Sequence, residues 1–174
     1  MSYSRFVWLL LFVSTSVLKS QIVQQNQPWW VNLGVGASFI GSDFSMNAGM
    51  VYCYQFERSI ISARMIGVTN INPTVQKLDP TSTKYKMTDY GFLYGPIWKS
   101  ECSYLSIGGG IGLARAAYIT PTDITTNTSI SLPLEVQWFW RPAHFFGIGI
   151  YSFASLNFEK VFCGAMLCAQ LGVW

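Results

Sequence analysis

The stretch Ser129–Trp140, Ser-Ile-Ser-Leu-Pro-Leu-Glu-Val-Gln-Trp-Phe-Trp, alternates between two kinds of side chain. Its even positions are all large and apolar, whereas its odd positions are mostly small or polar. A period of two is typical of a β-strand with two chemically different faces. The architecture of the whole protein therefore depends on which of these faces meets water.

The same alternation recurs along the rest of the chain, and no apolar stripe of helical period competes with it. The best uncharged apolar windows, Phe145–Leu156 and Val161–Trp174, hold 12 and 14 residues, fewer than the about 20 residues that a membrane-spanning helix needs. The pattern predicts eight strands, at Trp29–Ile40, Phe44–Phe56, Ser59–Thr69, Lys86–Lys99, Cys102–Tyr118, Ser129–Trp140, His144–Leu156 and Val161–Trp174.

The composition indicates a non-aqueous environment. Of 174 residues, 51% are apolar and only 11% are charged, against roughly 25% charged in a soluble domain. The formal net charge of +3 arises from 11 basic and 8 acidic residues. No basic patch is present that would attract nucleic acid.

The first twenty residues have the pattern of a secretory signal peptide. Arg5 precedes the short apolar run Phe6–Val13, and small polar residues follow it. We expect Met1–Ser20 to be removed before Gln21, which leaves residues 21–174 as one domain.

The connections between the predicted strands differ in length according to the end of the sheet. Those after the third and fifth strands, Asn70–Tyr85 and Ile119–Thr128, are long and polar. The others are short, as at Arg141–Ala143. Both long connections lie at the same end, which is expected of an outer-membrane barrel with short periplasmic turns and longer extracellular loops.

Glycine decides which face points inward. Glycine on a solvated strand face only weakens the strand, whereas a narrow eight-stranded lumen needs residues that leave room. A soluble lipocalin-like barrel would instead carry Lys, Glu and Thr on its outer face. We therefore predict an all-β, eight-stranded, antiparallel, up-and-down transmembrane β-barrel whose large apolar face meets lipid. Of 15 glycines, 12 fall on the inward face: Gly34, Gly36, Gly49, Gly91, Gly95, Gly108, Gly110, Gly112, Gly147, Gly149, Gly164 and Gly172.

Two prolines and four cysteines fit this picture less directly. Pro96 and Pro133 fall inside predicted strands, where proline forfeits a ladder hydrogen bond, so we expect a β-bulge at each. Trp174 falls on the inward parity of the last strand. The cysteines match neither a zinc pattern nor a disulfide scaffold, and we expect them to be small buried residues. They are Cys53, Cys102, Cys163 and Cys168.

The run Leu132–Pro142, together with Phe146–Tyr151 and Ala165–Gly172, resembles the C-terminal half of small outer-membrane β-barrel proteins of Bacteroidota. Asp89–Gly95 matches the same proteins more weakly. The resemblance implies an outer-membrane location and an eight-stranded barrel. It implies no activity, no cofactor and no catalytic residues.

Four polar residues, Arg64, Asp89, Glu135 and Gln137, fall on the inward parity of their strands. A charge in a narrow lumen must be paired, so we expect Glu135 to pair with Arg64 or with Arg141. A proton path, a gate or an active site is one interpretation of this cluster. The favoured interpretation is a structural polar core, because eight strands leave no open pore.

The residues offer little for catalysis at the outer rim. The one histidine, His144, lies beside the predicted periplasmic turn Arg141–Ala143. The acidic residues of the opposite rim are Asp43, Asp79, Asp123 and Glu159, with no His or Cys beside them in sequence. We therefore predict no catalytic, cofactor-binding or metal-binding residues, although a site built from carboxylates alone stays open.

The expected role is structural or recognition-based, with Asn70–Tyr85 and Ile119–Thr128 displayed outside the cell. The second hypothesis is binding or passage of a small solute, and the third is an enzyme. The expected partners are outer-membrane lipid and, during assembly, the barrel-insertion machinery. We expect a monomer, and the sequence names no extracellular ligand.

Overall fold

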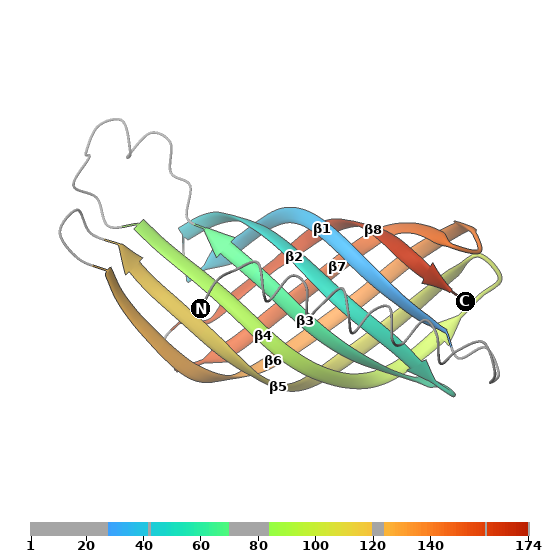
Figure 1. Ribbon diagram of the computed structural model, residues 1–174, viewed down its shortest axis with the longest axis horizontal. Coiled ribbons are helices and arrows are strands. Elements are labelled where there is room, and N and C mark those ends of the chain that lie inside the picture. The colour runs from blue at the N-terminus through green and yellow to red at the C-terminus, as the bar shows by residue number, and fades with distance from the viewer. Residues whose placement is uncertain (1–27, 42, 70–83, 120–123, 159, 174) are drawn as a thin grey trace, which may run out of the picture.

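The computed structural model describes residues 28–41, 43–69, 84–119, 124–158 and 160–173. Eight strands form one closed barrel in which every strand pairs antiparallel with its neighbours in the chain, and β8 pairs with β1 (Figure 1). The predicted fold class is confirmed. The strands are β1 (Trp29–Ile40), β2 (Asp43–Phe56), β3 (Ser59–Thr69), β4 (Lys84–Lys99), β5 (Ser103–Ile119), β6 (Ile124–Ala143), β7 (Phe146–Asn157) and β8 (Phe162–Val173).

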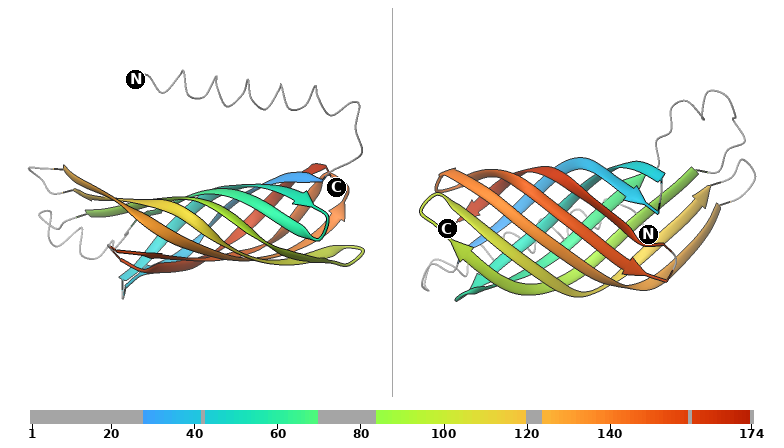
Figure 2. Two further views of the ribbon diagram at one scale, coloured as in Figure 1. Left: turned by 90° about the horizontal axis from the view of Figure 1, so that it is seen from below. Right: turned by 180° about the vertical axis from the view of Figure 1, so that it is seen from behind.

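The barrel closes along the full length of β1 and β8. Their register runs without a break from Trp29 opposite Val173 to Ile40 opposite Phe162. Closure matters in lipid, because an open sheet edge would leave backbone polar groups without partners. The strands cross the barrel at a slant and short turns join them at one end (Figure 2).

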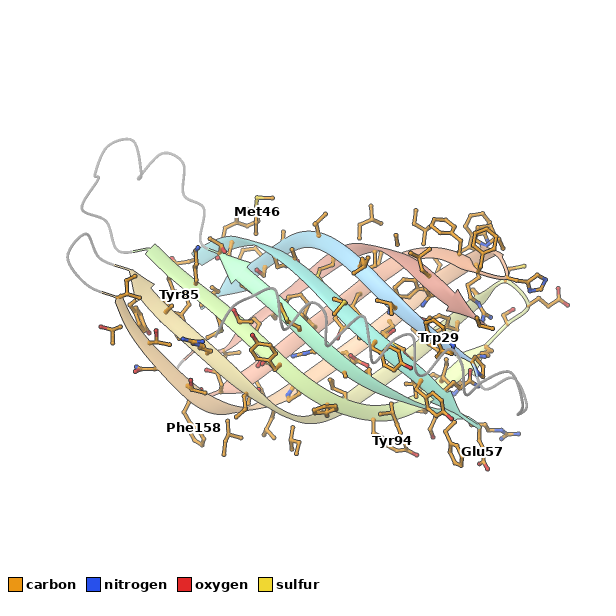
Figure 3. The ribbon with its side chains drawn as sticks, viewed as in Figure 1. Trp29, Met46, Glu57, Tyr85, Tyr94 and Phe158 are labelled. Carbon is orange, nitrogen blue, oxygen red and sulfur yellow. The ribbon has the colours of Figure 1, made fainter. Side chains whose placement is uncertain are left out.

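The predicted faces agree with the observed burial. On every strand one face points into the lumen and the other forms the outer wall. Most glycines and buried polar side chains lie on the inner face, together with large apolar side chains such as Trp30 and Phe139, and the outer wall is mostly large and apolar. Phe92 and Ile111, for example, are each 70% exposed on that wall. Trp29 and Tyr94 lie toward the end that carries the short turns, whereas Met46 and Phe158 lie toward the other end (Figure 3).

The sixth strand is longer than the sequence pattern predicted. Most of the expected loop Ile119–Thr128 is strand, since β5 and β6 stay paired as far as Ile119 opposite Ile124. Both faces of this extension are exposed, so it carries no alternation of burial that could mark it as strand. At the other end, the expected turn Arg141–Ala143 belongs to β6, where the register with β7 shifts between Trp140 and Ala143.

Neither proline produces the expected bulge. The β4–β5 ladder is interrupted between Tyr94 and Ile97, around Pro96, and then resumes in the same register. Around Pro133 the β5–β6 ladder is interrupted in the same way, again without a shift. The barrel accommodates the missing N–H groups by omitting local pairings, and Pro133 still lies opposite Ser155 of β7.

The cysteines divide into two buried and two exposed residues. Cys53 and Cys168 point into the barrel and are buried, as expected. The same expectation is wrong for Cys102, in a turn, and for Cys163, on the outer wall of β8. A thiol is apolar enough to face hydrocarbon, so Cys163 needs no polar partner there.

Three features of the sequence lie outside the described residues. These are the leader Met1–Ser20, most of the connection Asn70–Tyr85, and the terminal Trp174. The signal peptide and the start of the mature domain therefore stay predictions. Within the described ranges, no helix is long and apolar enough to cross a membrane.

Candidate functional site

Arg64 and Asp89 form a buried ion pair in the middle of the lumen. They come from the adjacent strands β3 and β4, where Asp89 lies opposite Ile66, two residues from Arg64. The Nε and Nη2 atoms of Arg64 donate to Oδ2 of Asp89 at 2.9 and 2.7 Å. Both side chains are 0% exposed. The cross-strand diagonal thus brings the two opposite charges together inside the barrel.

This ion pair reaches the opposite wall of the barrel. Arg64 also donates from Nη1 to the carbonyl of Leu134 at 2.9 Å and from Nη2 to that of Ala154 at 3.1 Å. Asp89 accepts from the hydroxyls of Ser131 and Ser155, each at 2.9 Å. The pair therefore joins β3 and β4 to β6 and β7 across the lumen.

Glu135 lies beside this pair but has different partners. Its Oε1 accepts from Ser62 at 2.6 Å and from Gln137 at 2.9 Å, and its Oε2 accepts from Tyr151 at 2.5 Å. The expected pairing of Glu135 with an arginine is wrong, because Asp89 occupies Arg64. Arg141 instead lies near the periplasmic rim, with its guanidinium 5.6 Å from the centre of the Tyr104 ring.

Gln137 extends the network toward the periplasmic end. Its Oε1 accepts from Asn32 at 3.1 Å and from Tyr104 at 3.2 Å. Gln170 then donates to the Tyr104 hydroxyl at 2.6 Å and to Oδ1 of Asn32 at 2.7 Å. All of these residues are buried. The four predicted interior residues therefore lie in one polar layer, which consists of two adjacent hydrogen-bonded groups, one around Arg64 and Asp89 and one around Glu135 and Gln137.

Glycines provide the space that this layer needs. A Cβ atom at Gly108 would lie 3.1 Å from both Cγ and Oε1 of Glu135. At Gly112 it would lie 2.7 Å from the Ser131 hydroxyl oxygen. The inward glycines of β5 thus allow the polar side chains of β6 to lie directly against the barrel wall.

Apolar side chains lie on both sides of the polar layer. On the periplasmic side, the Tyr104 ring stacks on the Phe139 ring, with 5.4 Å between the ring centroids. It is also tilted against the Trp30 ring, at a centroid distance of 5.3 Å. Toward the other end, five buried side chains from β1, β3, β4 and β8 point inward. These are Ile40, Val68, Tyr85, Met87 and Phe162.

The structure places His144 at the end opposite the predicted extracellular rim. It lies in the β6–β7 turn, where it lines a cavity of about 420 Å³ together with Cys102, Arg141, Lys99 and Glu101. In the part of the chain that the structure describes, no three His, Cys, Asp or Glu side chains are grouped to hold a metal ion.

The rim acids contribute little to this picture. Asp43 begins β2 and is exposed. Asp79, Asp123 and Glu159 lie outside the described residues.

Sequence reasoning found the charged members of the polar layer and one uncharged member, Gln137, and missed the other uncharged members. Inward parity identified Arg64, Asp89 and Glu135 because a charge on an interior position stands out. The hydroxyl and amide groups that complete the network share this parity, which is the signal that would have found them. They are Asn32, Ser62, Tyr104, Ser131, Tyr151, Ser155 and Gln170.

Solved structures of outer-membrane barrels resemble this fold, whereas no protein-family model and no curated protein matches the chain. Ail, the attachment invasion locus protein of Yersinia pestis, shares 14% identity over 86% of this chain and 100% of that one, with a TM-score of 0.61. Neisserial surface protein A shares 12% sequence identity over 83% of this chain and 96% of that one, with a TM-score of 0.66. The N-terminal barrel domain of Pseudomonas aeruginosa OprF shares 9% sequence identity over 85% of this chain and 99% of that one, with a TM-score of 0.57.

Identities this low establish a common fold and nothing about ligands. The closed eight-stranded barrel, its lipid-compatible outer wall and these structural neighbours define the class of the protein. It is a bacterial outer-membrane β-barrel. An origin in Bacteroidota stays a prediction.

Proposed function

We propose that this barrel has a structural or surface-recognition role in the outer membrane and that its lumen carries no solute. The observation that supports this proposal is the polar layer that crosses the lumen. Arg64 and Asp89 join four strands there, and every side-chain oxygen and nitrogen of the pair has a partner. A passage for solute would require these buried bonds to break together.

The recognition part of the proposal rests on the end that projects from the membrane. Strands β5 and β6 remain paired beyond the apolar belt, as far as Ile119 opposite Ile124. Pairing of β6 with β7 begins only at Ser131, so residues 126–130 have no neighbouring strand on that side among the described residues. An exposed strand edge can accept an extended peptide from a partner.

The structural neighbours are consistent with a surface role. One is an attachment invasion locus protein, and one of its structures holds the heparin analogue sucrose octasulfate. That ligand belongs to that protein. For this chain, an enzyme is the weaker hypothesis, since the one histidine lies at the periplasmic end with Cys102.

We further propose that the chain works as a monomer after insertion by the barrel-assembly machinery. The closed ladder from β1 to β8 leaves no strand edge within the apolar belt that would need a second copy.

Two measurements test the proposal, one on the purified, folded barrel and one on cells that carry the protein. In planar lipid bilayers we expect no steady single-channel openings, and such openings would contradict the closed lumen. In the second, residues 118–125 are replaced by a two-residue turn, which shortens the projecting hairpin and keeps Ala116 and Ala117, the residues that pair with Met87 and Lys86 of β4. We expect adsorption of the protein-bearing cells to their surface partner to fall, and unchanged adsorption would contradict recognition through this hairpin.

A further inference from the structure

The outer wall of the barrel carries two charged residues among the described strand positions that face outward. Both are cations, Lys86 on β4 and Arg115 on β5, and both are exposed. The remaining outward positions whose side chains the structure describes are apolar, small or hydroxyl-bearing. A charge against hydrocarbon is costly, so these two positions must lie outside the apolar core of the bilayer.

The strand register shows where the apolar belt ends on this side. Tyr90 lies opposite both Met65 and Leu113, and Leu113 lies opposite Ile130, so one wholly apolar row crosses four strands. In the next outward-facing row, toward the extracellular end, Arg115 lies between Thr88 and Thr128.

One row further out, Lys86 lies between Thr69 and Ala117. The two cations therefore stand directly above the belt, at the level of the outer-leaflet headgroups.

The two cations are close enough to act together. Arg115 is opposite Thr88, two residues from Lys86, so the cations are diagonal neighbours with Cβ atoms about 7 Å apart or slightly less. Among the residues that the structure describes, neither forms a hydrogen bond or an ion pair with another residue, and no carboxylate shares their face of the wall. The pair thus has uncompensated positive charge at a lipid boundary.

We propose that Lys86 and Arg115 bind the phosphate of a lipid in the outer leaflet. A guanidinium donates two parallel hydrogen bonds to a phosphate, and an ammonium adds a compact charge beside it. The hydroxyls of Thr88 and Thr128 flank Arg115 and supply further donors. Acyl chains of the same lipid lie against Tyr90, Leu113 and Ile130 below, so the site recognises a phosphate that is attached to a lipid.

A third cation at the same end provides a matched control. The ammonium of Lys160 lies 5.1 Å from the centre of the Tyr85 ring, and Tyr85 points into the lumen. Lys160 therefore carries the same charge at the same end of the barrel but lies over the mouth instead of on the wall. Lys160→Gln removes one positive charge without touching the proposed site.

The experiment measures lipid binding to the folded barrel in neutral detergent by native mass spectrometry. The probes are lipid A, dephosphorylated lipid A, inorganic phosphate and sucrose octasulfate. We expect wild-type protein to bind lipid A, and to bind it less tightly as salt concentration rises. Each cation near an anionic lipid strengthens binding about fivefold, so Lys86→Gln/Arg115→Gln weakens binding by about 25-fold. Lys160→Gln leaves it unchanged.

Faster gel migration of unheated samples shows that each variant is folded. Equal binding of lipid A by the double variant would overturn the proposal, as would equal binding of dephosphorylated lipid A by wild-type protein. Binding of inorganic phosphate or sucrose octasulfate that depends on the same two residues, without preference for lipid A, would replace the lipid site by a site for soluble anions.

Discussion

Removal of one partner from the Arg64–Asp89 pair is expected to destabilise the barrel strongly. In Asp89→Ala, the guanidinium loses two hydrogen bonds of 2.9 and 2.7 Å and keeps two to backbone carbonyls. Breaking a buried ion pair from one side costs about 3–5 kcal/mol. The hydroxyls of Ser131 and Ser155 also lose their acceptor. We therefore expect a loss of about 4 kcal/mol in the free energy of unfolding.

The double variant Arg64→Met/Asp89→Leu separates the unpaired charge from the lost volume. It replaces both charges by apolar side chains, an exchange that is often neutral or stabilising for a buried pair. We expect it to recover most of the stability that Asp89→Ala loses. Val136→Ala, on the lipid face of β6, is the control for a simple loss of side-chain volume.

Equilibrium unfolding in urea, followed by tryptophan fluorescence of the barrel in lipid vesicles, measures these differences. The heat-dependent gel shift reports independently on the folded fraction. An Asp89→Ala variant within about 1 kcal/mol of wild type would match the effect of a solvent-exposed pair and would refute the argument. A double variant as unstable as the single variant would refute it as well.

Three further predictions concern the interior and the cysteines. Glu135→Ala should destabilise the barrel in the same urea assay by about 1–3 kcal/mol, because Ser62, Gln137 and Tyr151 lose an acceptor; a neutral or stabilising effect would show that the two faces of β6 are reversed. Gly108→Ala should lower the free energy of unfolding by about 1–3 kcal/mol, because its Cβ would meet the hydrogen-bonded Glu135 at 3.1 Å. At Gly109 a Cβ would meet the flexible end of Leu134 at 3.2 Å and the Pro133 carbonyl oxygen at an ordinary 3.9 Å, so Gly109→Ala should be tolerated; equal effects would contradict the packing. In the folded barrel, a membrane-impermeant maleimide should label Cys102 but not Cys163, and a lipid-soluble maleimide should label Cys163. Cys53 and Cys168 are buried and should react with neither reagent until the barrel unfolds.

The sequence was most informative where the two faces of a strand meet different surroundings. Alternation along segments such as Trp29–Ile40 and Ser59–Thr69 predicted both strand ends correctly, because one face lies in the lumen and the other in lipid. Beyond the membrane, both faces of β6 near Thr126 meet water, so the alternation disappears and the sequence pattern predicts a loop where the structure has a strand.

The partners within the lumen were harder to predict than the residues themselves. Parity assigns Arg64 and Glu135 to the interior, but it does not say which carboxylate the guanidinium meets. That choice depends on the strand register, which places Asp89 on the diagonal from Arg64. The β-bulges expected at Pro96 and Pro133 are absent for a related reason. The sequence shows that an N–H group is missing, but it does not show whether the ladder forms a bulge or omits a pairing.

A cysteine scan of Ser129–Trp140 in the folded, lipid-embedded protein tests the central claim most directly. Each position is changed in turn to cysteine, in a background without the four native cysteines, and is given a nitroxide label. Collision of the label with lipid-dissolved oxygen is then measured by electron paramagnetic resonance. Even positions from Ile130 to Trp140 should show high oxygen collision, and odd positions such as Glu135 and Gln137 should show low collision. High collision at the odd positions, or no period of two, would contradict a lipid-facing apolar wall around a filled lumen.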